Sequence, residues 1–379
     1  MEFNFSEEQR LLKDSANSFL EEFSSSERIR EAMQSELGFN QEVWKKIAKE
    51  MGWLGILIPE KYGGLELSWI ELVALQEEMG RNLFCSPFHS TTCLGSVSIL
   101  EAGTEEQKSK YLPKVVNGDL LITLACLEDN GDWGPDGINT IYKKVGKDFL
   151  INGVKRYVPY GHCSDVILVA ARQEGTEGKE GISLFLTETK DSNLKKEKLT
   201  TMDQTRPQAE ITLNNLKLSN KSLLGSEGQG WDLLTKVRTL GALGLTAEQV
   251  GGSQKCLDMT CQYVLEREQF DRKIGSFQAV KHRLADMMVL VESARSAVYY
   301  AGCIATKNNS ELEEVVSIAK SYCSEAYFKC ASDSIQLHGG VGFTWEFDVH
   351  LYFKRAKSSE IYLGNPQIHK DKIARLLGI

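Results

Sequence analysis

Apolar residues recur with helical spacing through the first third of the chain. Near its start they fall on one helix face, at Leu11, Leu12, Ala16, Phe19 and Leu20. Ser6 and Gln9 ahead of them have the spacing of a capping box, which begins a helix, and Thr104 and Gln107 have the same spacing. Similar patterns predict helices over 40–51, 69–80 and 91–102. These patterns predict a helical N-terminal domain over residues 1–118.

From Gly118 the chain changes to short segments rich in β-branched and aromatic residues, separated by Gly, Asn and Asp. Such segments are typical of strands joined by turns. Strands are predicted over 120–126, 140–145, 149–152, 165–170, 182–186 and 210–218. They predict a small, β-barrel-like middle domain over residues 119–225.

Long helical patterns return after Gln229. They cover 233–265, 276–307, 310–337 and 347–358. Helices of this length pack apolar stripes against one another in antiparallel bundles. We therefore predict a C-terminal four-helix bundle over 226–379, an α+β fold class for the whole chain, and an oligomer.

Composition and charge exclude several classes of protein. Lys and Arg total 44 against 52 Asp and Glu, a net charge of -8. No nucleic-acid or anionic-membrane partner is expected, because both require clustered basic charge. The apolar runs are too short for a membrane span, and the N-terminus has no signal-peptide pattern. The nine cysteines show no Cys-x-x-Cys spacing, so we predict no metal site and no disulfide framework, and a cytoplasmic protein.

Two stretches of the C-terminal part resemble the acyl-CoA dehydrogenase family. Residues 263–278, with Arg267, Phe270 and Gln278, resemble its Arg-x-x-Phe segment and the Gln that follows. Residues 336–343 (Gln-Leu-His-Gly-Gly-Val-Gly-Phe) resemble its Gln-x-His-Gly-Gly motif. In that family both stretches hold the FAD of a neighbouring subunit. The order of helical, β and helical parts also resembles the family over nearly the whole chain.

The residue types suit this cofactor. Arg267 presents a planar fork of donors to a pyrophosphate. Gly339 and Gly340 allow the backbone to approach phosphate or ribose without a clashing Cβ. Packing and amide contacts are expected from Phe270, Gln278 and Gln336. A surface arginine and a helix-ending glycine pair would explain each motif alone, but their combination at family spacing favours FAD binding.

Three further stretches are similar to one bacterial branch of the family. They are residues 80–88, 202–207 and 343–352. Members of that branch act in the breakdown of steroid side chains, ring acids or dicarboxylic acids, often as hetero-oligomers.

The resemblance breaks where the family carries its catalytic base. Residues 360–368 resemble the Tyr-Glu-Gly-Thr stretch, whose Glu removes the α-proton of a CoA thioester. Leu363 stands in place of that Glu and cannot accept a proton. A second base position known in the family matches Gly241, which is equally inert. By the same resemblance, Asn365 and Gln367 are expected to contact FAD.

Two stretches that meet the flavin in the family are also altered. Leu127 replaces the hydroxyl residue that begins a flavin loop, although Glu128 beside it is kept. Pro159 replaces a Thr near flavin N5 and lacks an N–H. Tyr157 can still stack as an aromatic. We assign Leu127, Tyr157 and Pro159 to the FAD site.

Other residues could act as the base. His89 lies in the segment that lines the acyl pocket in the family, and imidazole accepts protons near neutral pH. A packed or solvent-facing histidine is the commoner situation. Tyr160 brings a phenol of unknown role. Glu248 follows Gly241 by two helical turns and is better explained by a helix-surface ion pair.

The resemblance implies an FAD-binding subunit of an acyl-CoA dehydrogenase, which desaturates an acyl-CoA thioester and passes electrons to an electron-transfer flavoprotein. A related dehydrogenase subunit, in a homo- or hetero-tetramer, is expected to supply the missing Glu. The alternatives are a homo-oligomeric flavoenzyme with a non-standard base, and a non-catalytic homologue. The sequence does not determine the acyl group.

Overall fold

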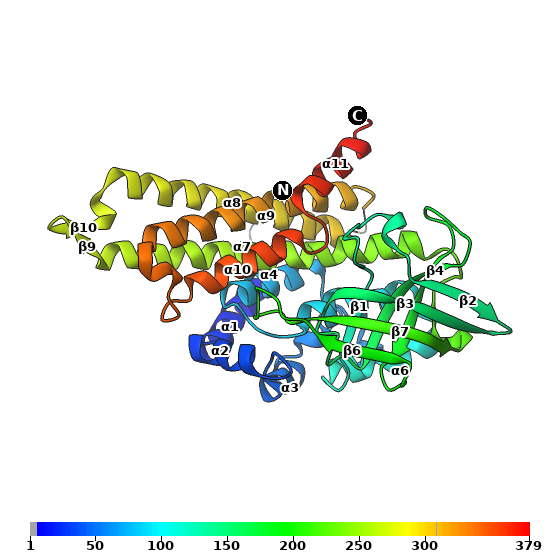
Figure 1. The fold of residues 1–379 in the computed structure, drawn as a ribbon. Helices are drawn as coiled ribbons and strands as arrows, with labels where there is room; N and C mark the ends of the chain where they lie inside the picture. The colour runs from blue at the N-terminus through cyan, green and yellow to red at the C-terminus, as the bar shows by residue number, and fades with distance from the viewer. Residues whose placement is uncertain (1–5, 308) are drawn as a thin grey trace. The chain divides into compact units, whose positions relative to one another are not determined.

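The computed structural model describes residues 6–307 and 309–379. Its contacts divide the chain into two compact units, coloured by residue number in Figure 1. Unit 1 comprises residues up to Glu31, Ser68–Phe84 and Ala242–Ile379, and unit 2 comprises Ala32–Leu67 and Cys85–Gly241. Within the described ranges, no helix is both long enough and apolar enough to cross a membrane.

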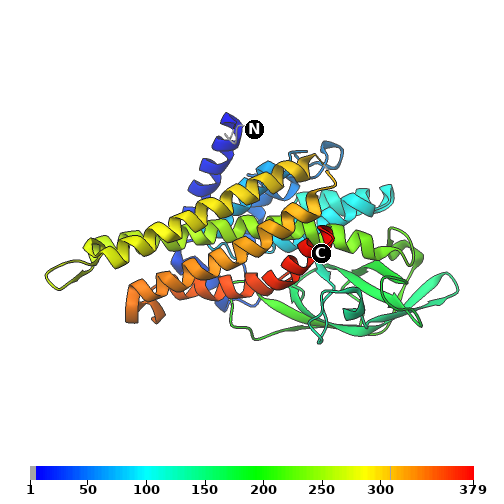
Figure 2. The same ribbon diagram turned by 90° about the horizontal axis from the view of Figure 1, so that it is seen from above.

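Unit 1 is built from helices. They are α1 (Glu7–Phe23), α4 (Trp69–Arg81), α8 (Gln278–Thr306), α9 (Leu312–His338), α10 (Val349–Ile361) and α11 (Pro366–Leu376). Helix α2 (Ser26–Gln34) begins here, and α7 (Gly230–Glu266) begins in unit 2 and continues into unit 1. A short hairpin of β9 (Glu268–Gln269) and β10 (Arg272–Lys273) joins α7 to α8. Figure 2 shows α8 and α9 side by side.

The predicted capping boxes begin the helices where expected. The Ser6 side chain accepts from the Gln9 backbone N–H, and the Gln9 side chain accepts from that of Ser6. Thr104 and Gln107 make the same reciprocal pair at the start of α6 (Glu105–Val116). Each pair satisfies amides that the first helical turn leaves without partners.

Helices α4 and α7 cross at two glycines within unit 1. A Cβ placed on Gly251 would lie 1.8 Å from the carbonyl oxygen of Glu77, and one on Gly80 would lie 2.0 Å from that of Glu248. Backbone therefore meets backbone at this crossing, which only glycine permits.

Gly251→Ala is expected to destabilise unit 1. The new methyl group must push α4 and α7 apart, and overpacking of this kind costs about 1–3 kcal/mol or more. Gly302→Ala in α8 is the matched control, because its Cβ would meet nothing closer than 3.4 Å. Thermal melts should show a lower Tm for Gly251→Ala and no loss for Gly302→Ala. Equal melting of both variants would contradict the close crossing.

Glu77 joins three helices of unit 1. Its carboxylate accepts from Lys13 of α1 at 2.9 Å, and from Arg295 and Tyr299 of α8 at 3.0 and 2.6 Å. Burial alone would raise the pKa of Glu77, but the two cations and the hydroxyl outweigh it and lower that pKa. The beneficial contribution of Glu77 is thus present above the ordinary glutamate pKa and lost as the pH falls through the folded value.

The stabilising effect of Glu77 should therefore fade in acid. Wild type is expected to melt higher than Glu77→Gln at pH 7, and the gap should shrink as the pH falls below about 4.5. Glu78→Gln should show the opposite trend, because burial raises the pKa of Glu78. The Tm of wild type should rise relative to that of Glu78→Gln as the pH falls. Melting curves between pH 3 and 7 test both signs. A gap for Glu77→Gln that stays constant would show that its charge does not stabilise the fold.

Unit 2 contains one eight-stranded sheet and short helices. The helices are α3 (Gln41–Lys49), η3 (His89–Ser96), α5 (Val97–Ala102) and α6 (Glu105–Val116). The strands are β1 (Ile122–Ala125), β2 (Ile141–Val145), β3 (Asp148–Pro159), β4 (Val166–Gln173), β5 (Ile182–Glu188), β6 (Leu194–Lys198), β7 (Gln208–Leu218) and β8 (Leu223–Leu224). The sheet order is β6-β7-β3-β2-β4-β5-β8, and β1 pairs in parallel with β4.

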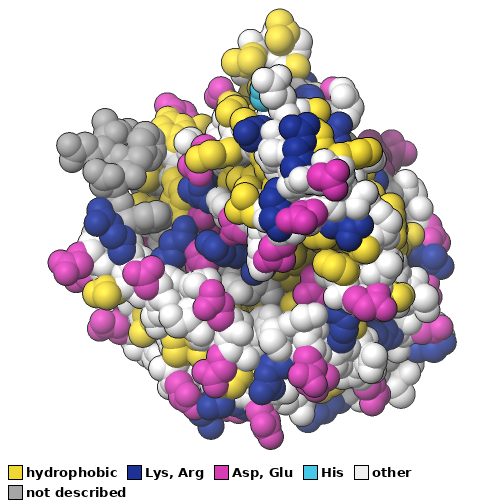
Figure 3. All heavy atoms as spheres, turned by 90° about the vertical axis from the view of Figure 1, so that its left-hand side faces the viewer, with side chains coloured by type: hydrophobic (Ala, Val, Ile, Leu, Met, Phe, Trp, Pro, Cys, Tyr) yellow, Lys and Arg dark blue, Asp and Glu magenta, His cyan; other side chains and the backbone are white. Residues whose placement is uncertain are grey.

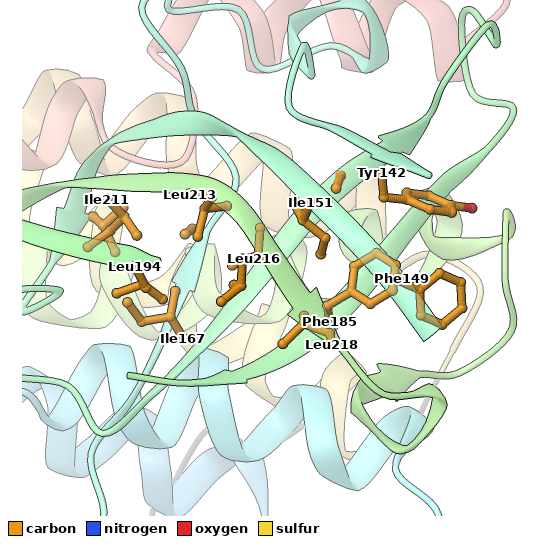
Figure 4. Close-up of a cluster of buried hydrophobic side chains, with 14 of the residues drawn as sticks. Tyr142, Phe149, Ile151, Ile167, Phe185, Leu194, Ile211, Leu213, Leu216 and Leu218 are labelled. Atoms are coloured by element: carbon orange, nitrogen blue, oxygen red, sulfur yellow. The ribbon is translucent and has the colours of Figure 1, made fainter. Parts of the chain in front are cut away.

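One face of the sheet holds the core of unit 2, shown in Figure 4. At one end of it Tyr142, Phe149 and Phe185 meet edge to face, with ring centroids 5.0–5.6 Å apart. Alternate residues of β7 join this core, which is the period-two pattern that predicted the strand.

The fold class is confirmed as α+β, with helical, β and helical parts in the predicted order. The strands form a path that ends at β6 and β8, a sheet that stays open rather than closing as a barrel. The predicted helix over 91–102 is a buried π-helix, η3, followed by α5. Sequence patterns missed α2, α11 and β6, because these short elements carry mostly polar residues.

Candidate functional site

Leu363 lies in the turn between α10 and α11, in unit 1. Its backbone φ is +60°, which is rare for a branched residue, and Gly364 follows at +100°. The Leu363 side chain is buried, with a residue exposure of 6%. Asn365 caps α11 by accepting from the Ile368 N–H at 3.0 Å, and Gln367 is exposed.

Two buried donors bind the carbonyls of this turn. His369 Nε2 donates to the Leu363 oxygen at 3.0 Å, and Lys320 Nζ donates to the Gly364 oxygen at 3.0 Å. A carbonyl only accepts, so His369 Nε2 carries a proton. The position that the resemblance assigns to the base is therefore held in a fixed, strained backbone and bears no titratable side chain.

The hairpin between α7 and α8 presents Phe270. Phe270 and Asp271 have φ of +56° and +61°, the values of a two-residue turn that usually selects Asn and Gly. Phe270 is 85% exposed, and Arg267 and Gln278 are also exposed. A strained, exposed aromatic contributes little to folding, so this geometry points to a binding role.

The Gly339–Gly340 turn ends α9 near the same hairpin. Gly339 has φ +65° and ψ −143°, a conformation that is essentially open only to glycine. A Cβ on Gly339 or Gly340 would meet no atom within 4 Å, so open space lies beside this backbone. The His338 ring stacks on Tyr263 of α7 at 4.4 Å, and its Nδ1 contacts the Ser334 oxygen at 2.7 Å. Burial lowers the pKa of His338.

The structure thus brings together the two motifs expected to hold FAD. Tyr263 precedes Arg267 by one helical turn, and His338 precedes the glycine pair, so their stacking joins the Arg267 segment to Gln336, Gly339 and Gly340. An exposed guanidinium, an exposed aromatic and open glycine backbone fit the pyrophosphate, ring and ribose of FAD. Basic and acidic side chains are interspersed over the face drawn in Figure 3.

In unit 2, the expected flavin contacts lie where β1 and β3 end. The Arg156 N–H donates to the Leu127 oxygen at 2.9 Å, and Thr123 Oγ1 donates to the Pro159 oxygen at 2.7 Å. Leu127, Tyr157 and Pro159 are therefore neighbours. Tyr157 has φ +56° and is 44% exposed.

Tyr160 is buried and directly follows β3. It has φ +52°, and the register of β3 against β7 shifts just before it. Its ring meets Phe39 edge to face at 6.1 Å, and its N–H donates to the Pro207 oxygen. Tyr160 is thus packed inside unit 2, three residues after Tyr157 of β3.

Glu128 anchors the loop that the resemblance assigns to the flavin. Its carboxylate accepts from the buried Lys155 ammonium at 2.6 Å and from the backbone N–H groups of Asn139 and Thr140 at 2.9–3.1 Å. Burial alone would raise the pKa of Glu128, but the Lys155 cation and these donors lower it. Glu128 therefore shapes the loop as a carboxylate and is not available as a base.

Trp133, further along this loop, is held by Arg238 of α7. Its carbonyl accepts from Arg238 Nη1 of α7 at 2.6 Å. The Arg238 guanidinium also lies 5.0 Å from the Trp231 ring and 5.9 Å from the Trp133 ring, within cation–π range.

The residues considered as alternative bases make contacts that stabilise the fold. His89 Nε2 lies 2.9 Å from the Gly241 carbonyl oxygen, and His89 is buried. Because the carbonyl accepts, this nitrogen carries a proton and only Nδ1 could act as a base. Glu248 pairs with Arg355 at 2.6 Å, but both side chains are buried, so the expected ion pair is not on the helix surface.

Sequence reasoning missed the buried lysines. Lys155 and Lys320 are both 0% exposed, although lysine is among the residues most often found at the surface. A signal existed for Lys320, since helical spacing places it on the face of α9 shared by Val316, Cys323 and Tyr327. Lys155 gave no such signal, because the strand predicted over 149–152 ended before it, whereas β3 continues to Pro159.

Family models match the chain over three segments. The N-terminal, middle and C-terminal domain models of acyl-CoA dehydrogenase match residues 6–119, 126–216 and 228–378.

Known proteins are similar over the whole length. "Acyl-CoA dehydrogenase IpdE2" of Mycolicibacterium smegmatis is 31% identical over 371 residues, 98% of each chain. "Caffeyl-CoA reductase-Etf complex subunit CarC" of Acetobacterium woodii is 28% identical over 98% of this chain and 99% of its own. A chain of the ChsE4-ChsE5 complex from Mycobacterium tuberculosis has a TM-score of 0.90 at 28% identity, covering 100% of this chain and 99% of that one.

The predicted family is therefore confirmed, including its similarity to bacterial members. Three domain models in the family's order and a relative 31% identical over 98% of each chain agree with the fold and with the motifs expected for the family. The chain belongs to the acyl-CoA dehydrogenase family of oxidoreductases, whose cofactor is FAD.

Proposed function

We propose that this chain is an FAD-binding subunit of an acyl-CoA dehydrogenase assembly in which a related partner chain supplies the catalytic base. The reaction is α,β-desaturation of an acyl-CoA thioester: a base takes the proton from Cα, and a hydride leaves Cβ. FAD, when bound, accepts the hydride and passes two electrons to an electron-transfer flavoprotein. We place the assembly in the cytoplasm.

The buried Leu363 carries this proposal. Its turn is held in place by His369 and Lys320, yet the side chain at this position cannot accept a proton. A positioned base is worth about 10²–10⁴-fold in rate. A chain that keeps the turn and the FAD motifs without the base is best explained as one half of a shared active site.

The geometry of α9 supports a cofactor shared between chains. Lys320, beside the Leu363 turn, and Gln336, beside the glycine turn, are sixteen residues apart on one helix. At 1.5 Å per residue this separates them by about 24 Å. The Arg267 and Gln336 motifs of one chain are thus free to serve the cofactor of a second chain, as an oligomer would allow.

Two relatives make the assembly reasonable. One similar structure is a complex of two different proteins, ChsE4 and ChsE5, and one relative is named as a subunit of a reductase–Etf complex. By analogy we propose a hetero-tetramer with a related dehydrogenase subunit, or a homo-tetramer if no partner exists.

His89 favours a second candidate, a homo-oligomeric flavoenzyme with a non-standard base. Its Nδ1 could take a proton while Nε2 stays bound to the Gly241 carbonyl. Tyr160 is a poorer candidate because it is packed against Phe39. A non-catalytic homologue is the third possibility.

The visible spectrum of the chain purified alone, before and after anaerobic addition of a panel of acyl-CoAs, distinguishes the three. We expect a flavin band that does not bleach, and copurification of a second dehydrogenase-like chain from the native host. Bleaching by the isolated chain would overturn the partner proposal in favour of a base such as His89. Absence of both flavin and thioester binding would support the non-catalytic homologue.

Arg267→Ala is expected to lower the flavin content of the purified protein several-fold. The loss follows from removing charge-assisted hydrogen bonds to the pyrophosphate. Because Arg267 is exposed, the Tm of the flavin-free protein should not change. Lys281→Ala, an exposed cation at the start of α8, is the control for charge alone. Equal flavin content in both variants would remove Arg267 from the FAD site.

A further inference from the structure

Lys320 is a fully buried cation on α9. Its ammonium donates to the Ser324 hydroxyl at 2.9 Å and to three backbone carbonyls, those of Ser359 and Glu360 at 3.1 Å and that of Gly364 at 3.0 Å. Three N–H groups thus serve four acceptors.

The acceptors belong to two segments that flank Leu363. Ser359 and Glu360 are at the end of α10, where helix carbonyls lack intrahelical partners and carry negative partial charge. Gly364 is on the other side of Leu363. One cation therefore holds both sides of the turn, and burying an ammonium is costly unless such partners surround it.

Lys320 is itself held in place. Ser324, one helical turn along α9, accepts from Lys320 and also from Gln249 Nε2 of α7 at 3.0 Å. The far end of the turn is fixed by His369, whose Nε2 donates to the Leu363 carbonyl. Buried hydrogen bonds of α7 and α9 side chains thus hold the turn in its position.

We propose that Lys320 is the positioning residue for position 363: it fixes the backbone from which the side chain projects, whether that is leucine or a carboxylate placed there. The inference rests on the proposed function in treating position 363 as the base position. Misplacing a reacting group by about 1 Å can cost 10²-fold in rate. A carboxylate at 363 should therefore work only while Lys320 holds the turn.

The test combines exchange and kinetics on the full-length chain. Hydrogen–deuterium exchange of peptides covering 359–365 is compared in wild type, Lys320→Met and Tyr299→Phe. Methionine keeps the length of the side chain without its donors. Tyr299→Phe also removes one partly buried hydrogen bond of unit 1, but one made to Glu77 and not to the turn. Flavin reduction by acyl-CoA is then measured in Leu363→Glu with and without Lys320→Met.

Exchange in 359–365 should accelerate at least 10-fold in Lys320→Met and stay unchanged in Tyr299→Phe. In the Leu363→Glu background, Lys320→Met should lower kcat at least 10-fold while KM stays within 3-fold. Unchanged exchange in Lys320→Met, or an unchanged kcat, would overturn the role of Lys320. If Leu363→Glu reduces no flavin, the proposed function fails, and the exchange result alone then decides whether Lys320 fixes the turn.

Discussion

Replacing Leu363 with glutamate is expected to let the isolated chain reduce its own flavin with acyl-CoA. The backbone of this turn is already fixed, so the substitution adds a proton-accepting carboxylate at a position that is already held in place. A general base contributes about 10²–10⁴-fold. Anaerobic stopped-flow absorbance should show flavin bleaching in Leu363→Glu at least 100-fold faster than in wild type.

Leu363→Gln is the matched control for this gain. Glutamine has nearly the same shape as glutamate but is no base at neutral pH, so its rate should stay at the wild-type level. Rates that rise equally in both variants would mean that polarity, not proton transfer, limits the reaction. A wild-type chain as fast as Leu363→Glu would mean that another residue already serves as the base.

Breaking the pair between Glu128 and Lys155 is expected to cause the largest loss of stability in unit 2. Both side chains are buried and lie 2.6 Å apart. Removal of one member leaves a buried charge without its counter-ion, which typically costs about 3–5 kcal/mol. Urea unfolding of Lys155→Met and of Glu128→Gln, followed by tryptophan fluorescence, should show losses of this size.

The double variant identifies the cause. Glu128→Gln with Lys155→Met leaves no unpaired charge, so its loss should be clearly smaller than the sum of the two single losses. Additive losses would show that the two side chains stabilise unit 2 independently. Flavin content measured in parallel tests whether the loop from Leu127 onward also loses its shape, since Glu128 anchors it through Asn139 and Thr140.

Much of the fold could be predicted because its signals are local. The Ser6 and Thr104 capping boxes act within one helical turn, and both appear as expected. The helix predicted over 310–337 spans Leu312–His338, because its apolar period extends over many turns. The strand predicted over 149–152 is longer, Asp148–Pro159, because pairing with β7 extends it through polar residues.

The sequence by itself determined the family, indicated the motifs expected to hold the cofactor, and showed that Leu363 and Gly241, at the positions expected for the base, carry no carboxylate. These are properties of residue identity and spacing, and a missing carboxylate is visible without coordinates. Only the tertiary structure decided that Glu128, Lys155 and Lys320 are buried. Their roles depend on partners distant in sequence, such as Gly364 for Lys320, and a lysine that caps carbonyls looks the same in sequence as a solvated one.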